Sequence, residues 1–183
     1  SLTEKIKLFA QALKRDFRIS NPRVAVLALN PIPGAEERDV IKPVIDQLAD
    51  NQVNAFGPYT ADNFFSNNLY NDFDGVLAMY HDQGMTPFLT LTPEGGVEMV
   101  SGLPIVCTST LQGASYDLAG KNVADESALR RAIYLAMDVC RNRAMYDEPF
   151  ENPLPKLYHE KRDESEKVRF AIPKKHENSI KER

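Results

Sequence analysis

His81 is the residue whose type and position best suit chemistry. It directly follows the apolar run Asp74–Tyr80, which reads as a buried strand of a parallel sheet. Open α/β sheets hold their ligands at the carboxyl ends of such strands. An imidazole there could bind a metal or move a proton, with Asp82 orienting the ring, or it could simply cap the next helix. One histidine does not make a transition-metal site, so further ligands would have to come from elsewhere in the fold.

A second candidate is the segment Gln112–Asp125, which is rich in small residues. Small residues let a backbone approach a ligand closely, and a carboxylate such as that of Asp117 can accept hydrogen bonds from both hydroxyls of a ribose. The same composition is ordinary for a surface loop, with Asp125 capping the helix that follows. The residues alone therefore leave a cofactor loop and a plain connection both open.

Several common site signatures do not occur in the sequence. There is no Gly-x-Gly-x-x-Gly or Walker loop for phosphates, no Gly-x-Ser-x-Gly nucleophile elbow and no His-Glu-x-x-His zinc motif. A net charge of −4 also lacks the excess of cations on which nucleic-acid binding depends. We therefore expect neither a common phosphate cradle nor a nucleic-acid partner.

The composition indicates a packed globular chain. Its 183 residues are 43% hydrophobic, which suits one domain or slightly more. Cys107 and Cys140 are too few for a disulfide framework and fit a reducing compartment. No apolar run approaches the roughly 20 residues that span a bilayer, and no signal-peptide pattern is visible. We expect a cytoplasmic protein with no membrane partner.

Apolar spacing of three and four predicts the helices that position these candidates. They are expected over residues 2–17 after a Thr3 cap, over 36–49, where Pro43 produces a kink or a late start, and over 125–143 after an Asp125 cap. The side chains expected to face the core share that spacing. They are Ile6, Phe9, Leu13 and Phe17 in the first helix, Val40, Ile41, Val44, Ile45 and Leu48 in the second, and Leu129, Ile133, Ala136 and Cys140 in the last.

Strands are expected between these helices. They lie near residues 23–29, 53–56, 74–80, 97–100 and 105–109. Strands that alternate with helices imply an α/β fold, with a layered parallel or mixed sheet and flanking helices. Residues 1–155 are expected to form this domain. In residues 156–183 charges of both signs are interspersed, which favours a flexible solvated tail over a docking arm.

Several segments of the sequence resemble the 4-hydroxythreonine-4-phosphate dehydrogenase (PdxA) family, the enzymes of vitamin B6 synthesis. The resemblance runs nearly end to end through about Tyr158, and the strand with its Tyr-His-Asp-Gln-Gly block is the most specific part. The segments that carry it are Arg23–Pro31, Phe56–Ala61, Phe73–Gly84, Gly102–Val106 and Gly113–Asp125. The last of these is also similar to the adenosine-binding loop of isocitrate and isopropylmalate dehydrogenases.

The resemblance implies a fold, two cofactors and an assembly. The fold is that of the isocitrate and isopropylmalate dehydrogenases, of which this chain corresponds to the second half, without the first part. Family members oxidise a hydroxyl of a phosphate-bearing substrate with NAD, and a divalent metal on three histidines polarises that hydroxyl. Their active site is completed by a dimer partner, which implies a homodimer here. His81 matches a metal ligand, and the residues that match the cofactor loop are Gln112, Gly113, Asp117, Gly120 and Asn122.

Other positions depart from the family pattern at polar functional residues. Ile32 stands where the family has a metal histidine, Leu89 where it has a lysine, and Glu98 where it has an asparagine. Cys107 replaces the substrate-binding arginine, and Gln112 replaces the histidine that opens the adenosine loop. Isoleucine cannot donate electrons to a metal, and charge-assisted contacts are the strong ones for a phosphate. The scaffold residues are retained while the residues for chemistry are replaced.

These departures lead to two hypotheses. In the first, the chain is the C-terminal half of a PdxA-like dehydrogenase and is catalytically inactive by itself, so none of its residues is assigned a catalytic role. In the second, it is an interaction or adenine-nucleotide-binding module that reuses the scaffold. In both we expect a homodimer, with Val97, Met99 and Val100 near the contact.

Overall fold

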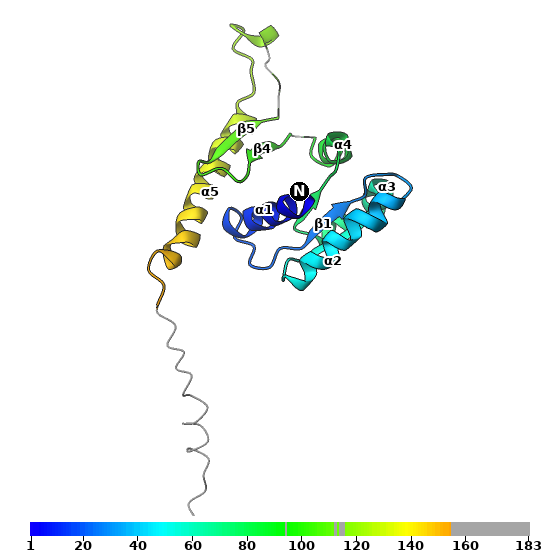
Figure 1. Cartoon of the computed structure of the whole chain (residues 1–183). Helices are drawn as coiled ribbons and strands as arrows, with labels where there is room; N and C mark the ends of the chain where they lie inside the picture. Colours follow the sequence, from blue (N-terminus) through cyan, green and yellow to red (C-terminus); the bar gives the residue numbers. More distant parts are fainter. Residues whose placement is uncertain (94, 112, 114–115, 155–183) are drawn as a thin grey trace, which may run out of the picture. The chain divides into compact units, whose positions relative to one another are not determined.

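A computed structural model describes residues 1–93, 95–111, 113 and 116–154 (Figure 1). The chain divides into two units, Ser1–Phe150 and Glu151–Arg183. Gln112 and the predicted tail, residues 156–183, lie outside the described residues. In the described part, no helix combines the length and the apolar character needed to cross a membrane. The helices and strands described below belong to the first unit. The last helix extends one residue beyond it, to Glu151.

A three-stranded parallel sheet forms the centre of this unit. β1 (Val24–Leu27) lies between β2 (Ala55–Tyr59) and β3 (Gly75–Leu77), and it pairs in parallel with both. All four residues of β1 are 0% exposed. The predicted α/β fold with a parallel sheet is confirmed. The strand expected over 74–80 is shorter and only half-buried, because β3 is an edge strand of this sheet.

Helices cover both faces of the sheet. On one face, α1 (Leu2–Arg15) and α2 (Lys42–Asp50) pack against Val24 and Val26. On the other, α3 (Ala61–Ser66) and the short 3₁₀ helix η2 (Leu69–Asp72) pack against Ala25 and Leu27 through a cluster of aromatic rings. This burial on both faces explains why β1 is continuously apolar.

Helix α1 begins at Leu2, where the expected range begins, but its cap lies two residues earlier than expected. Ser1, not Thr3, is its cap: the Ser1 hydroxyl accepts from the Glu4 N–H while the Glu4 carboxylate accepts from the Ser1 amino group. The helix ends at Arg15 with Asp16 as its C-cap, so Phe17 lies beyond it and is exposed. The prediction that Phe17 faces the core is therefore wrong, whereas Ile6 and Leu13 are buried as expected.

The predicted helix over 36–49 is divided in two. A π-helical turn, η1 (Glu37–Ile41), precedes α2, and Pro43 lies in the first turn of α2, which agrees with the late start. The π-helical turn directs Glu37 and Ile41 inward, because each such turn takes an extra residue. Val40 is consequently exposed, contrary to the expectation that it faces the core.

A second, antiparallel sheet pairs β4 (Val97–Val100) with β5 (Cys107–Thr110). Helix α4 (His81–Leu91) precedes this hairpin, and the 3₁₀ helix η3 (Tyr116–Leu118) and the long helix α5 (Ser127–Glu151) follow it. The Thr108 hydroxyl donates to the Ala132 carbonyl at 3.0 Å, which joins the hairpin to α5. Gly96 permits a close approach of α4, because a Cβ atom there would lie 2.4 Å from the Phe88 ring.

Helix α5 buries a different face from the one expected. Leu129 and Ile133 are 57% and 51% exposed, Ala136 is half-buried and Cys140 is exposed. The buried residues are Ala128, Ala132, Val139 and Arg143. The helix has two apolar stripes, and the one with small alanines lets the hairpin approach closely. The helix begins at Ser127, whose N–H donates to the Asp125 carboxylate just before the helix. It continues beyond the expected end at Arg143, as far as Glu151.

The buried Arg143 side chain joins three segments of the fold. Its guanidinium donates to both Asp16 carboxylate oxygens, at 2.8 and 3.0 Å, and to the Leu103 carbonyl at 3.1 Å. The Arg143 and Asp16 side chains are only 9% and 3% exposed. The end of α1, the turn between β4 and β5, and α5 therefore meet at one ion pair. The Asp16 carboxylate raises the pKa of Arg143, which keeps the guanidinium charged.

Replacing Arg143 by methionine should lower the free energy of unfolding by about 3–5 kcal/mol, because Asp16 is left as an unpaired buried charge. Urea denaturation followed by circular dichroism measures the loss. Arg141→Met is the matched control, since its contact with Asp138 is exposed and should be worth less than about 1 kcal/mol. Equal losses in the two variants would show that the Arg143 pair does not join these elements as described.

Candidate functional site

The carboxyl edge of the parallel sheet is closed by the side chain of Gln83. Its Oε1 accepts from the backbone N–H groups of Met79 and Tyr80, at 3.0 and 3.3 Å, and its Nε2 donates to the Ala28 carbonyl at 3.0 Å. The chain leaving β3 is thereby bound to the end of β1. This arrangement fixes where α4 begins and hence where His81 lies.

His81 is the first residue of α4 and is exposed. In the described part of the chain, its ring has no hydrogen-bond or ion-pair partner, and Asp82 makes no contact with it that would orient the ring. Tyr80, not His81, is the residue that precedes the helix as its cap. The imidazole is thus free at the edge of the sheet where a ligand would approach.

The loop after β1 is held by a carboxylate that the sequence analysis did not single out. Glu37, on the π-helical turn, accepts from the Asn30 N–H at 2.7 Å and from the Gly34 N–H at 2.6 Å. The Asn30 side-chain amide donates to the same carboxylate at 3.5 Å. The N–H groups of Gly34 and Asn30 lower the pKa of Glu37 to about 2. An acidic residue three positions after Pro-Gly was the signal available in the sequence.

Ile32 lies at the outer part of this loop and is 84% exposed. Its side chain has no lone pair, so it cannot join the His81 imidazole as a metal ligand. Among the residues that the structure describes, no group of three or more His, Cys, Asp or Glu side chains is placed to hold a metal ion. A metal held by three protein ligands does not fit these residues.

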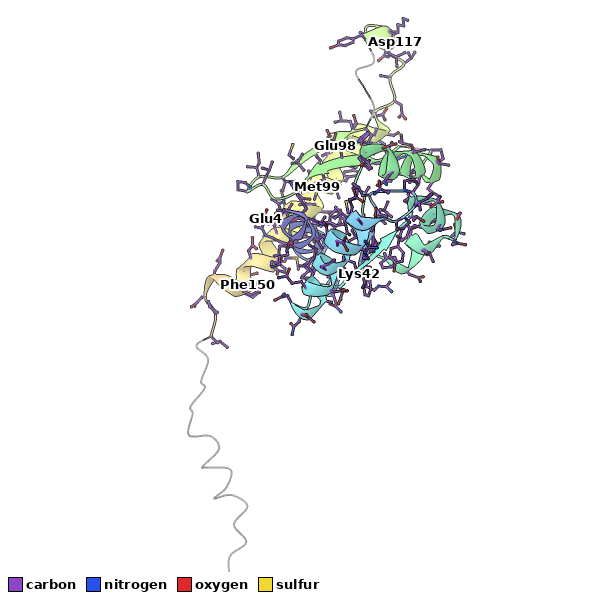
Figure 2. The ribbon with its side chains drawn as sticks, turned by 45° about the vertical axis from the view of Figure 1, so that its right-hand side comes forward. Glu4, Lys42, Glu98, Met99, Asp117 and Phe150 are labelled. Carbon is purple, nitrogen blue, oxygen red and sulfur yellow. The ribbon has the colours of Figure 1, made fainter. Side chains whose placement is uncertain are left out.

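The predicted cofactor loop lies between β5 and α5, and only part of it is described. Asp117 is exposed on η3 (Figure 2), and beside it a hollow of about 380 Å³ is lined by Leu118, Ala119, Gly120, Asn122 and Ala124. Gly120 and Asn122 have positive φ angles of 78° and 52°, which turn the backbone around the hollow. Asp117 does not line the hollow itself, and Gly113 is exposed.

These residues fit the adenosine half of a dinucleotide. An exposed carboxylate next to a hollow in the backbone is the arrangement that a ribose and its base require. A Cβ atom at Gly120 would meet nothing within 4 Å, so the space beside the turn is open, although the positive φ there still favours glycine. The assignments of Gln112, Gly113, Asp117, Gly120 and Asn122 remain predictions.

The positions that would hold a phosphate carry no cation. Leu89 is half exposed on α4, and Cys107 is exposed on β5. Glu98 on β4 (Figure 2) is exposed and accepts from the Ser109 hydroxyl at 2.9 Å, so it supports the hairpin. A phosphate at this surface would meet hydrocarbon, a thiol and a negative charge, which is unfavourable.

Comparison with known proteins gives concordant matches. Residues 1–136 match the family model described as pyridoxal phosphate biosynthetic protein PdxA. A 4-hydroxythreonine-4-phosphate dehydrogenase from Bacteroides thetaiotaomicron is 46% identical over 92% of this chain and 48% of its own length. One from Prosthecochloris aestuarii is 44% identical over 74% of this chain and 41% of its own length.

The fold matches as well. The crystal structure of a 4-hydroxythreonine-4-phosphate dehydrogenase from Klebsiella pneumoniae superposes with a TM-score of 0.63 at 31% identity. The match covers 73% of this chain and 42% of that one. The chain therefore spans about half the length of the relatives it matches.

Glu37→Gln should destabilise the fold at pH 7, because an amide cannot accept from both the Asn30 and Gly34 N–H groups. The carboxylate's stabilisation is complete above its ordinary pKa of 4.5 and is lost as the pH falls towards about 2. Melting temperatures measured between pH 2 and 7 should therefore converge for the variant and the parent at low pH. Glu36→Gln, an exposed neighbour, should leave the profile unchanged. A pH-independent difference for Glu37→Gln would contradict the role given to its charge.

Proposed function

Because the chain belongs to the PdxA family, we propose that it forms part of a PdxA-like, NAD-dependent 4-hydroxythreonine-4-phosphate dehydrogenase and that it is catalytically inactive alone. In this proposal the chain keeps the site for the adenosine half of NAD. The relatives that it matches are dehydrogenases of this kind, which supports an oxidoreductase of pyridoxine biosynthesis. The chain spans about half their length, so the full reaction is part of the proposal.

The donor set at the sheet edge carries the proposal of inactivity. Hydroxyl oxidation in the family uses a metal to polarise the substrate oxygen, and such a site needs several protein ligands. Here His81 offers one nitrogen, while the exposed Ile32 offers none. The cations for a substrate phosphate are replaced by Leu89 and Cys107. Neither metal polarisation nor phosphate binding is supported by these side chains.

The adenosine loop carries the proposal of nucleotide binding. When bound, NAD supplies the acceptor for a hydride. The carboxylate of Asp117 accepts hydrogen bonds from the ribose hydroxyls, and the backbone turn at Gly120 and Asn122 receives the base. This proposal assigns no partner to the pyrophosphate, so the adenosine moiety supplies most of the binding energy.

The alternative function is an interaction or adenine-nucleotide-binding module. One observation favours it: the exposed stripe of α5, which consists of Leu129, Ile133 and Met137, offers apolar surface that nothing in the described unit covers. A contiguous exposed apolar stripe on a helix marks an interaction surface. The nucleotide titration below separates this function from a dehydrogenase subunit.

We expect ADP-ribose and NAD to bind with similar, about millimolar affinity, which corresponds to roughly −4 kcal/mol. The nicotinamide half finds no partner, so it should add little. Isothermal titration calorimetry with the intact chain measures both ligands. Asp117→Ala should weaken both at least about tenfold, since a charged acceptor is lost. Asp50→Ala, which removes an exposed carboxylate at the end of α2, should have no effect.

The outcomes separate the hypotheses. If neither ligand binds at saturating concentration, the loop is vestigial and the interaction module becomes the better explanation. NAD binding far more tightly than ADP-ribose would reveal nicotinamide contacts. Formation of NADH from 4-hydroxythreonine-4-phosphate with added Zn²⁺ or Mg²⁺, followed by absorbance, would overturn the proposed inactivity.

We also propose that the chain forms a homodimer, and the exposed apolar residues support particular positions for the contact. Of the three residues expected near it, Val97 and Met99 are half-buried and Val100 is exposed. The exposed stripe of α5 presents more apolar surface, with Ile133 at its centre. An interface of ordinary size buries about 1,600 Å² in total and persists at micromolar concentration when its core is apolar.

Sedimentation at tens of micromolar should therefore give a dimer mass. Ile133→Asp should give a monomer with unchanged circular dichroism, because it places a charge in the apolar contact without touching the buried face of α5. Val40→Asp is the matched control, since Val40 is an equally exposed aliphatic residue on η1, and it should remain dimeric. A monomer mass for the parent chain would refute the homodimer.

A further inference from the structure

A pocket of about 490 Å³ lies between the α3–η2 segment and α4. It is at the carboxyl edge of the parallel sheet, since α3 follows β2 and α4 follows β3. This edge is where open α/β sheets bind ligands, and the volume lies within the range of small-molecule sites. None of the residues predicted to bind the cofactor or a metal lines the pocket.

The pocket uses a different face of α4 from the one that bears His81. Asp82, Thr86 and Thr90 are spaced four apart, so they form one row along the helix, and all three line the pocket. His81 and Leu89, which are eight apart, form a separate row and do not line it. The pocket therefore lies on a different face of α4 from His81 and Leu89, the positions that the family resemblance assigns to the metal and the substrate phosphate.

One wall of the pocket is apolar and well supported. Phe65 packs against Phe64 and Tyr70, with ring centroids 5.2 and 6.2 Å apart, and Phe64 is fully buried. Pro87 and Leu91 face the same pocket from α4. Because Phe65 is fixed by rings on both sides, this wall offers a firm surface for an aromatic or branched apolar group.

Two hydroxyl groups of the pocket are available as acceptors. The Tyr70 hydroxyl donates to the Asn68 side-chain oxygen at 3.1 Å, and the Thr90 hydroxyl donates to the Thr86 carbonyl at 2.8 Å. Their protons are used, so both hydroxyl oxygens face a ligand as acceptors. Gln83 also lines the pocket, but its amide is fully engaged at the sheet edge.

Among the residues that the structure describes, Asp82 is the one charged residue that lines the pocket, and its carboxylate has no cationic partner there. A single unpaired negative charge favours a cationic donor and disfavours an anion. The apolar wall then favours a ligand whose remaining part is apolar.

We propose that this pocket binds a small primary amine with an aromatic or branched apolar body. The ammonium group lies against the Asp82 carboxylate and donates to the hydroxyl oxygen of Thr86, one turn further along α4. The apolar body lies against Phe65 and Leu91. The chemical class is that of aryl-alkyl amines, for which 2-phenylethylamine is a suitable probe.

Titration of the intact chain with three phenylalkyl probes that differ in the charge of their polar group tests the proposal. 2-Phenylethylamine should bind at least about tenfold more tightly than 2-phenylethanol, and 3-phenylpropionate should not bind, because only the amine complements Asp82. Amide chemical-shift changes should concentrate at Tyr70, Thr86 and Thr90. Equal affinity for the amine and the alcohol, or shifts located elsewhere, would overturn the proposal.

Substitutions distinguish the contribution of the Asp82 charge to binding from that of the apolar wall. Asp82→Asn should reduce amine affinity about tenfold and leave alcohol binding unchanged, while Leu91→Ala should weaken both. Asp72→Asn is the matched control, because it removes an exposed carboxylate on η2 that does not line the pocket. If Asp72→Asn weakened the amine as much as Asp82→Asn, the attraction would come from general surface charge and the assigned site would be wrong.

Discussion

The four residues of β1 are completely buried, so every polar group of its backbone must find a partner within the protein. Along the strand, β2 and β3 supply these partners. Beyond its carboxyl end the chain needs side chains instead: Gln83 satisfies the Ala28 carbonyl, and Glu37 satisfies the Asn30 N–H. The loop after β1 and the segment between β3 and α4 are therefore shaped by the burial of β1. A ligand at this edge meets backbone that is already fixed.

The charge at this edge has a definite sign. Glu37 stays ionised because backbone N–H groups donate to it, and Asp82 adds an unpaired carboxylate at the start of α4. Carboxylates at this edge repel a phosphate and attract an ammonium group. The affinity proposed for amines uses this negative charge, whereas the proposed loss of phosphate binding rests on Leu89 and Cys107, where the family resemblance expects cations.

The sequence pattern was sufficient for β1, because a strand buried on both faces is continuously apolar and flanked by breakers. It predicted a strand up to Tyr80 directly before His81, whereas β3 ends at Leu77 and His81 is the first residue of α4. It failed for α5, where two apolar stripes compete and periodicity alone cannot tell which one is covered. The stripe that is buried includes Arg143, a charged residue whose partner, Asp16, is remote in sequence. The role of Glu37 was also missed, because a carboxylate that accepts hydrogen bonds from loop N–H groups does not contribute to the spacing of apolar residues.

The antiparallel hairpin connects this packing to the nucleotide loop. Two strands alone are marginally stable, so β4 and β5 depend on their neighbours. Three contacts hold them: the Thr108 hydroxyl to the Ala132 carbonyl, the close approach at Gly96, and Arg143 to the Leu103 carbonyl. The loop that carries Asp117 starts from β5 and returns through α5, so both of its ends are set by these contacts. Loosening the Arg143 pair would let the two ends of the loop move independently, and the positions of Asp117 and its hollow would no longer be fixed. The nucleotide affinity proposed for this chain would therefore depend on an ion pair that touches no part of the loop.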